Sequence, residues 1–212
     1  MGNNEREAEL REDGITLIAG VDETGKGAWA GPVVAAAVIL PDRFERGKIR
    51  DSKAMKNEGT REGEYRRILA EALAISVDWN SHREIDAASE RGEYNTIHED
   101  LLLRTIASLR PPPQFVLIDS VDLPELGIRH ESFDKGESLS LSIAAASVVA
   151  RVTRDRIMRD LDVLFPGYAF AQQKGYGGGD GAHQRALDEI GPSPVHRFST
   201  SVVKASVQQG TS

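Results

Sequence analysis

The most informative absence from this 212-residue sequence is that of cysteine. Without a thiol the chain cannot build a disulfide framework, a thiolate metal site or a cysteine nucleophile, and we expect a cytoplasmic protein. Long hydrophobic runs are absent as well: the longest, Ala30 to Leu40, is about half of what a bilayer span needs and contains Gly31 and Pro32. The N-terminal segment MGNNEREAELREDG is too charged for a secretory signal. We therefore expect neither a secreted nor a membrane protein.

An overall excess of positive charge is also lacking. Lys and Arg number 26 against 33 Asp and Glu, and the net charge of -7 argues against a broad nucleic-acid-binding surface. The charge is uneven, however, because nine basic residues stand against five acidic ones between Arg43 and Arg67. This segment is either an ordinary solvated stretch or part of a face that favours a polyanion.

The composition is otherwise that of an ordinary globular protein, with 40% hydrophobic and 28% charged residues. A chain of this length can bury a sizeable core, and no repeat or low-complexity segment divides it. We expect one folded domain over residues 15–200, an N-terminal extension over residues 1–14 and a flexible tail over residues 201–212.

Hydrophobic patterning predicts five strands. Ile15–Val21 is β-branched, and the turn signal TGKG after it makes the apolar run Pro32–Leu40 its hairpin partner. The run FVLI before Asp119 follows a predicted helix, which is the order expected of a strand parallel to an earlier neighbour. The other two predicted strands are Leu73–Trp79 and Ile128–Phe133.

Helical spacing of apolar residues predicts several helices between these strands. They cover Thr60–Glu71, Ser81–Ala88, Tyr94–Leu109 and Gln184–Ile190, with one long helix from Ser138 onward. Residues 165–183 are rich in glycine and aromatics and are predicted to form a loop. Strands and helices in this order indicate an α/β fold with a mixed five-stranded sheet flanked by helices.

Acidic residues follow or precede several of these elements. Asp22 and Glu23 end the first strand, Asp119 ends the strand FVLI, and Glu137 precedes the long helix. If the two strands are adjacent and parallel, their carboxylates meet at one sheet edge, where sites commonly form. Such a cluster would need cations, and hard oxygen ligands suit Mg²⁺ or Mn²⁺. The alternative is that these acids are ordinary turn residues, because neighbours on an ideal strand point to opposite faces.

The glycines that follow the first strand allow two interpretations. Gly25 and Gly27 flank Lys26, and they either permit a tight turn or let the backbone approach a ligand closely. In the second case the amides would donate to a phosphate or sugar, and Lys26 would add a positive charge.

An imidazole can transfer a proton near a metal-bound water, and three histidines are candidates for this role. We interpret His98, inside a predicted helix, as structural, and His196 as ordering a C-terminal turn. His183 lies in a predicted loop, and it either transfers a proton in catalysis or has a structural role.

Several segments, in order along the chain, resemble those of the ribonuclease HII family. They run from about Ile15 to Ser199 and read IAGVDETGKGAWAGPVVAAAVIL, DSKAM, FVLIDS, KGES, LSIAAASVVARVTRDRIM, KGYGGG and GPSPVHRFS. The resemblance implies a ribonuclease H-like fold with a C-terminal helical subdomain inside residues 15–200.

The resemblance also implies roles for the four acids. Asp22, Glu23 and Asp119 match the first three acidic positions of the family's metal site, which holds two divalent ions, Mg²⁺ or Mn²⁺. The fourth acid of the family is usually Asp in a KGD segment, and Glu137 in KGES stands there instead.

Further positions match residues that contact the nucleic acid in this family. Lys26, between Gly25 and Gly27, stands where the family usually has Arg in a motif that recognises the ribose and the junction. Tyr176 in KGY matches a tyrosine that stacks beside the sugar following the ribonucleotide, and Lys53 in DSK is similar to a residue near a phosphate.

The activity that the resemblance implies is endonucleolytic. Such an enzyme hydrolyses the RNA strand of RNA/DNA hybrids, cleaves 5′ of ribonucleotides embedded in duplex DNA, and leaves 5′-phosphate and 3′-hydroxyl ends. It would serve ribonucleotide removal from DNA and RNA primer removal, and we expect a monomer. Lys26 and Glu137 resemble the residues of ribonuclease HIII at the matching positions. One alternative is therefore a ribonuclease with HIII-like specificity, which cleaves RNA/DNA hybrids only. A catalytically inactive nucleic-acid-binding module is another.

Overall fold

The computed structural model describes residues 4–49, 55, 57–179 and 181–209. The chain forms two compact units, each made of segments that are distant in sequence. Unit 1 contains the chain up to Thr24 with Val34–Asp78 and Glu99–Val152, and unit 2 contains Gly25–Val33, Trp79–His98 and the chain from Thr153 onward.

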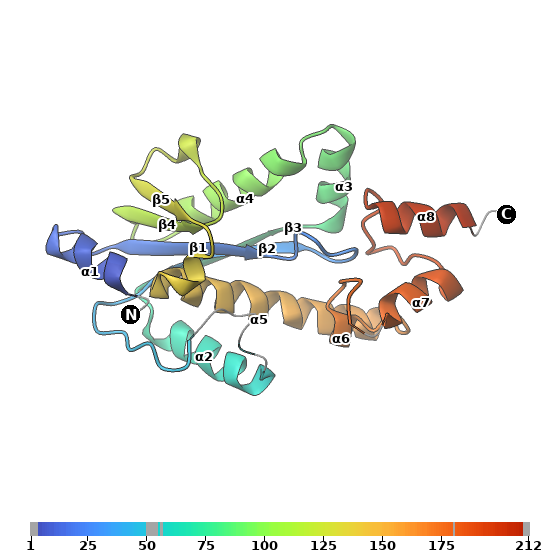
Figure 1. Ribbon diagram of the computed structural model, residues 1–212, viewed down its shortest axis with the longest axis horizontal. Helices are drawn as coiled ribbons and strands as arrows, with labels where there is room; N and C mark the ends of the chain where they lie inside the picture. Colours follow the sequence, from blue (N-terminus) through green and yellow to red (C-terminus); the bar gives the residue numbers. More distant parts are fainter. Residues whose placement is uncertain (1–3, 50–54, 56, 180, 210–212) are drawn as a thin grey trace. The chain divides into compact units, whose positions relative to one another are not determined.

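A five-stranded mixed sheet forms the centre of unit 1, in the order β3-β2-β1-β4-β5 (Figure 1). Its strands are β1 (Ile18–Thr24), β2 (Val33–Ile39), β3 (Ala74–Asn80), β4 (Phe115–Asp119) and β5 (His130–Phe133). β2 is antiparallel to β1, whereas β4 is parallel to both β1 and β5. The predicted hairpin, the predicted parallel neighbour and the predicted mixed sheet are confirmed.

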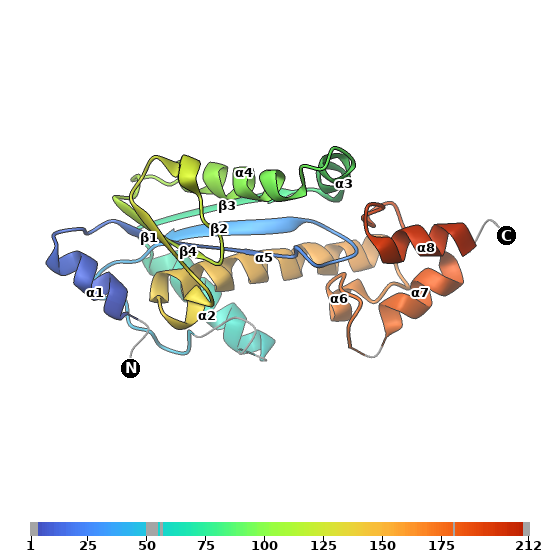
Figure 2. The same ribbon diagram turned by 45° about the horizontal axis from the view of Figure 1, so that its top comes forward.

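The sheet core is explained by the residues of its central strands. All seven residues of β2, VVAAAVI, are buried, which is typical of a strand that is covered on both faces. Figure 2 shows α4 (Tyr94–Ala107) over one face, and α2 (Glu58–Glu71) with α5 (Leu141–Leu164) over the other. A side chain at Gly20 of β1 would collide with the backbone of Ser142 and Ile143, so glycine permits α5 to approach the sheet closely.

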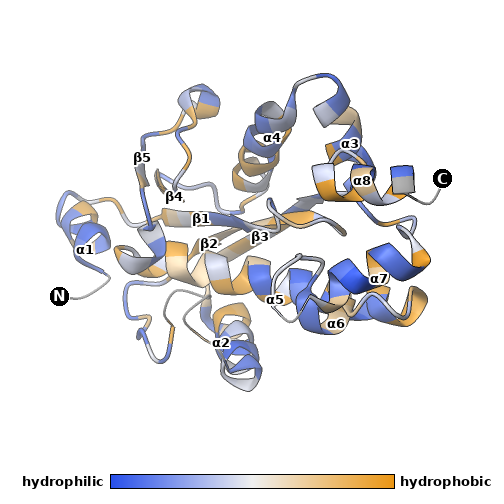
Figure 3. Ribbon diagram, turned by 45° about the vertical axis from the view of Figure 1, so that its right-hand side comes forward, coloured by the Kyte–Doolittle hydropathy of each residue, from blue (hydrophilic) through white to orange (hydrophobic). Residues whose placement is uncertain are grey.

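The helices lie mostly where the sequence predicts them. The remaining ones are α1 (Glu5–Glu12), α3 (His82–Glu90), α6 (Phe170–Gln173), α7 (Ala182–Ile190) and α8 (Ser201–Gln209), with short 3₁₀ turns at Pro124–Leu126 and Gly136–Ser138. The hydropathy colours of Figure 3 show that α5 is more hydrophobic in its first turns than further along, in keeping with the buried run from Leu141 to Ala150. No described helix has both the length and the apolar character that a membrane span requires.

Two local predictions are wrong. The long helix begins at Leu141 and not at Ser138, because residues 136–138 form a separate 3₁₀ turn. The glycine-rich segment predicted to be a loop contains α6, which buries Phe170 completely against Met158 and Tyr168.

The ends of the described chain are also more ordered than expected. In place of a flexible tail, residues 201–209 form α8, which contacts α7 and buries Val203. At the other end, α1 places Leu10 in a core cluster with Ile18, Phe115 and Ile143 of unit 1. The Glu7 carboxylate accepts hydrogen bonds from the Ser140 hydroxyl (2.6 Å) and the Ser142 amide (2.9 Å), so α1 caps the first turn of α5.

Candidate active site

The candidate site of unit 1 starts from two neighbouring strand ends. β1 and β4 run parallel with Val21 opposite Ile118, so the next residues, Asp22 and Asp119, come at the same level of the sheet. Asp22 is buried and Asp119 is partly exposed. The predicted meeting of these two carboxylates at one sheet edge follows directly from this register.

Glu23 lies within β1, whereas the sequence pattern predicted that this strand ends at Val21. The strand continues to Thr24, and the Glu23 amide donates a hydrogen bond of 2.7 Å to Asp22 Oδ1. This bond holds the Asp22 carboxylate against the main chain of the next residue. The Glu23 side chain takes no part in this bond, but its charge acts on the pKa of Asp22.

The electrostatics of Asp22 show that the three acids interact. Burial raises its pKa well above the ordinary value, and the charges of Glu23 and Asp119 raise it further. Hydrogen bonds from Ser147 of α5 and from the Glu23 amide act in the opposite direction. A buried carboxylate with two acidic neighbours favours either a proton or a cation.

Glu137 reaches the same region through the 3₁₀ turn at residues 136–138. The Gly136 amide donates a hydrogen bond of 2.6 Å to Asp119 Oδ1, which fixes this turn beside the end of β4. A side chain at Gly136 would come within 2.7 Å of Ile143 Cδ1 and 3.4 Å of Asp119 Oδ1, so a larger residue there would displace the end of the Ile143 side chain. Glu137 itself is buried, with 6% of its surface exposed.

The donor set of these four residues consists entirely of carboxylate oxygens, the chemistry that Mg²⁺ and Mn²⁺ prefer. Within the described part of the chain, however, no three or more Asp, Glu, His or Cys side chains are arranged so that they could hold a metal ion. The residues thus fit such ions by chemical type and burial, and their side chains would have to rotate to bind them.

The glycine-flanked turn predicted as a substrate contact lies in unit 2. Gly25 has a positive φ of 100°, and a side chain there would collide with the Arg154 guanidinium, so the tight-turn interpretation holds for this residue. Around Gly27, by contrast, a Cβ would meet open space. The Lys26 carbonyl accepts hydrogen bonds from the Tyr94 hydroxyl and from Arg197, both at 2.9 Å.

Two buried arginines that the sequence analysis did not single out organise this turn. Arg197 also donates to the Gly31 carbonyl at 2.9 Å, and burial lowers its pKa to about 10. Arg154 donates to the carbonyls of Pro32 and Lys174, both at 2.8 Å. Their positions inside the segments VARVTRDRIM and VHRFS were the available signal, because those segments carry the family resemblance.

Tyr176 lies against one of these arginines. The Arg154 guanidinium carbon is 5.0 Å from the centre of the Tyr176 ring, within the range of a cation–π contact. On either side of Tyr176, the Gly175 carbonyl accepts from the Trp29 amide at 2.8 Å, and a side chain at Gly177 would collide with the Trp29 ring. The KGYG segment is therefore packed on the loop that follows the GKG turn.

Lys53 lies outside the described residues. His98 is buried with its ring centre 4.5 Å from that of Tyr94, and burial lowers its pKa to about 4. His183 and His196 are both completely buried in unit 2.

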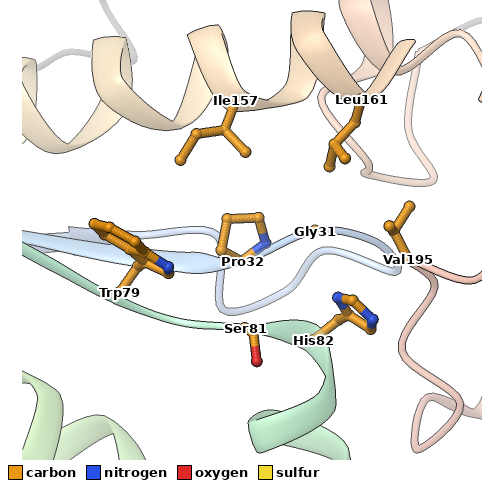
Figure 4. Close-up of a pocket in the computed structure, with 8 residues that line it drawn as sticks. All are labelled: Gly31, Pro32, Trp79, Ser81, His82, Ile157, Leu161 and Val195. Carbon is orange, nitrogen blue, oxygen red and sulfur yellow. The ribbon is translucent and has the colours of Figure 1, made fainter. Parts of the chain in front are cut away.

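An apolar cavity of about 310 Å³ also lies in unit 2 (Figure 4). Ile157 and Leu161 of α5 face it from one side, and Trp79 and His82 from the other. None of the residues predicted to act on a substrate lines it.

Comparisons with known proteins show which proteins the chain is similar to. The family profile described as Ribonuclease HII matches residues 19–202. A Ribonuclease HII of Listeria monocytogenes is 45% identical over 201 residues, covering 93% of this chain and 73% of that protein. The Ribonuclease HII of Geobacter sulfurreducens is 40% identical, covering 90% and 85% respectively. Among solved structures, the ribonuclease H2 from Pyrococcus horikoshii superposes with a TM-score of 0.76 at 23% identity, covering 91% of this chain and 97% of that one.

Proposed function

The chain belongs to the ribonuclease HII family and is a metal-dependent ribonuclease H, and from this premise we propose its substrates and its catalytic residues. It cleaves the RNA strand of RNA/DNA hybrids and, in duplex DNA, the phosphodiester bond 5′ of an embedded ribonucleotide. The products carry 5′-phosphate and 3′-hydroxyl ends. We propose that it acts as a monomer in the cytoplasm, in ribonucleotide removal from DNA and in RNA primer removal.

One observation carries the proposal for the catalytic centre. Asp22 is buried, and its pKa is raised by burial and by the charges of Glu23 and Asp119. Three carboxylates that lie close together repel one another, and a divalent cation bound between them would relieve this repulsion. This is the arrangement expected where metal ions are held for phosphodiester hydrolysis.

We assign the four carboxylates to two Mg²⁺ or Mn²⁺ ions. Asp22 would be shared, Glu23 and Asp119 would hold the ion on the leaving-group side, and Glu137 would hold the ion on the water side. When bound, such a pair supplies activation of the attacking water and stabilisation of the leaving 3′ oxygen. The long side chains of Glu23 and Glu137 can rotate further than those of aspartates, which accommodates the movement that ion binding requires.

The contribution of the chain's own hydrogen bonds is orientation. The Glu23 amide holds one oxygen of Asp22, and the Gly136 amide holds one oxygen of Asp119. A carboxylate offers about four acceptor positions, so these bonds, and the Ser147 bond to Asp22, still leave positions that an ion can use. Both donors are main-chain amides, one of Glu23 itself and one of Gly136, which precedes Glu137. The main chain that carries these two glutamates therefore orients the two aspartates.

Recognition of the ribonucleotide is assigned to unit 2. We propose that the backbone of Gly25, Lys26 and Gly27 contacts the ribose, whose 2′-hydroxyl distinguishes RNA from DNA. The Tyr94 and Arg197 hydrogen bonds to the Lys26 carbonyl keep this turn in one conformation. Tyr176, held over Arg154, would stack beside the neighbouring sugar. Lys53 keeps its proposed phosphate contact on the family resemblance alone.

Strand cleavage of two labelled duplexes tests this function. One is DNA with a single embedded ribonucleotide, and the other is a continuous RNA/DNA hybrid, each in Mg²⁺ and in Mn²⁺. We expect both to be cut, the first on the 5′ side of the ribonucleotide, and we expect Asp119→Asn to lose cleavage of both. The exposed Asp122→Asn is the matched control, because the Asp122 side chain is 78% exposed and pairs with His130 on β5.

Each other outcome has a definite meaning. Cleavage of the hybrid alone would favour the ribonuclease HIII-like specificity that Lys26 and Glu137 suggest, and Lys26→Arg would then be expected to restore cutting at the single ribonucleotide. Cleavage of neither duplex in either metal would contradict the proposal and favour a binding module.

A further inference from the structure

Two buried histidines of unit 2 connect the C-terminal segment to Tyr176. His183 Nδ1 lies 3.0 Å from the Tyr176 carbonyl oxygen, and His183 Nε2 lies 2.9 Å from His196 Nε2. His196 Nδ1 in turn lies 2.9 Å from the Ser193 amide and 2.8 Å from the Ser193 hydroxyl. Both imidazoles have no exposed surface.

The donors and acceptors in this chain fix where each proton resides. The Ser193 amide can only donate and lies 2.9 Å from His196 Nδ1, closer than the Ser193 carbonyl oxygen at 3.3 Å. We therefore assign Nδ1 as an acceptor, which places the proton of a neutral His196 on Nε2. The Tyr176 carbonyl can only accept, so His183 carries its proton on Nδ1 and leaves Nε2 as an acceptor. His196 therefore donates to His183, and all bonds run one way, from Ser193 to Tyr176.

A second proton on either ring would break this arrangement. Protonated His183 would turn its Nε2 hydrogen against the Nε2 hydrogen of His196. Protonated His196 would turn its Nδ1 hydrogen against the Ser193 amide, and this hydrogen would have to compete for the Ser193 carbonyl at 3.3 Å or the Ser193 hydroxyl at 2.8 Å. The surroundings also disfavour charge, because His183 lies with its ring centre 5.3 Å from Trp29 and 5.4 Å from Phe170.

We infer that His183 and His196 are positioning residues that hold the main chain of Tyr176 through this one-way chain of hydrogen bonds. The amide of Tyr176 is held as well, since it donates to the Gln173 carbonyl at 3.0 Å. The ring of Tyr176 then has a defined place over Arg154. The inference rests on the proposed function in so far as Tyr176 contacts the substrate.

Other titratable groups face the pair and must be counted in any pH measurement. Burial is the largest cause that lowers the pKa of His196 to about 4, and the charges of His183 and of His82 at the start of α3 lower it as well. The backbone hydrogen bond with Ser193 acts in the opposite direction. Burial likewise lowers the pKa of His183, and Tyr168 lies edge-on to both rings. The pair is therefore neutral at pH 7.

The first test is the ¹⁵N spectrum of the histidine side chains of the whole protein at pH 7. We expect His183 to be protonated on Nδ1 only and His196 on Nε2 only, and both to stay neutral at pH 6. A charged imidazole at either position, or a proton on His183 Nε2, would overturn the inferred one-way chain of hydrogen bonds. This measurement needs no substrate and no variant that might fail to fold.

The second test is a double-mutant cycle on kcat/KM for the duplex with one ribonucleotide. His183→Leu removes the bond to Tyr176, and we expect a loss of about tenfold, whereas His183→Asn, which can still donate to the carbonyl, retains most of the activity. In a Tyr176→Ala background, His183→Leu should change kcat/KM by no more than about twofold. His130→Leu, which removes an imidazole from β5, is the matched control and should leave kcat/KM unchanged.

The outcomes separate this inference from the proposed function. An equal loss from His183→Leu with and without Tyr176 would show a merely structural role and overturn the inference. If the Tyr176→Ala variant cleaves as the wild type does, the proposed contact between Tyr176 and the substrate is wrong. The hydrogen bonds of His183 and His196 would then have no effect on catalysis through Tyr176. If Tyr176→Ala is impaired but the histidine tautomers differ from those expected, the substrate contact of Tyr176 is supported and the one-way chain of hydrogen bonds is contradicted.

Discussion

Asp22 lies where a charge is unfavourable, since burial and two acidic neighbours all raise its pKa. Its pKa is higher in the folded than in the unfolded chain, so the folded state binds the proton more tightly. The resulting stability is present below the unfolded pKa and is lost as the pH rises through the folded pKa. At neutral pH without metal, Asp22 therefore destabilises the fold.

Replacing this carboxyl by an amide should stabilise the metal-free protein. We expect Asp22→Asn to raise the Tm at pH 7 in a chelator by about 2–4 °C, because no buried charge remains. Added Mg²⁺ should raise the Tm of the wild type but not that of the variant. Differential scanning calorimetry measures both, with the exposed Asp122→Asn as control. A lower Tm for Asp22→Asn in chelator would contradict the electrostatic argument.

Single residues also show how far the sequence alone could lead. Asp22, Glu23, Asp119 and Glu137 could be named because acids at strand ends and before a helix are visible in a linear pattern. The two arginines near the GKG turn were harder to recognise, because a charged residue is usually solvated and only the tertiary contacts show these two to be buried. The direction of the hydrogen bonds between His183 and His196 likewise depends on atoms that are distant in sequence.

Among the elements, α1 has a role that its sequence does not suggest. Its residues, EREAELRE, are almost all charged, so no amphipathic pattern predicts that it packs on the sheet. The structure nevertheless buries Leu10 and Glu7, and Glu7 caps α5 through Ser140 and Ser142. The expected extension over residues 1–14 is thus part of unit 1.

The cap can be tested by substitution. We expect Glu7→Ala to lower the free energy of unfolding by about 1–3 kcal/mol, because the Ser140 hydroxyl and the Ser142 amide lose their common acceptor. Glu12→Ala, at the exposed end of the same helix, should have little effect. Urea unfolding measures both variants, and equal stability of Glu7→Ala and the wild type would refute the cap.

The strands were better predicted than the short helices, for a physical reason. β2 and β4 are continuous apolar runs, and the parallel order of β1 and β4 follows from the helix between them. α6 has only four residues and lies among glycines, so its helicity depends on packing Phe170 into the core of unit 2 and not on local preference. The sequence pattern did not indicate α8 either, since among its residues 201–208 only Val203 and Ser206 are buried.

For the chain as a whole, the buried histidines should make the fold sensitive to acid. Burial lowers the pKa of both His98 and His196 from 6.5 to about 4. Between these values the unfolded chain binds protons that the folded chain does not, so stability falls as the pH falls from about 7 toward 4. Asp22 acts in the opposite direction, because its folded pKa is raised.

Urea unfolding of the Asp22→Asn variant isolates the contribution of the histidines. We expect the urea midpoint to decrease steadily between pH 7 and pH 4.5, and we expect His98→Phe to show a shallower decrease. The matched control His130→Gln should follow the parent. A midpoint that does not change over this range would show that the buried imidazoles titrate as they do in the unfolded chain.

The central claim is that the carboxylates of β1, β4 and the turn at residues 136–138 act together on metal ions. Calorimetric titration of Mn²⁺ into the wild type, Asp22→Asn, Asp119→Asn and Asp122→Asn tests it most directly. Saturable binding to the wild type and to Asp122→Asn, weakened at least about tenfold in the other two variants, is the predicted result. Binding to Asp22→Asn and Asp119→Asn with the affinity of the wild type would contradict the account, because the ions would then be held elsewhere.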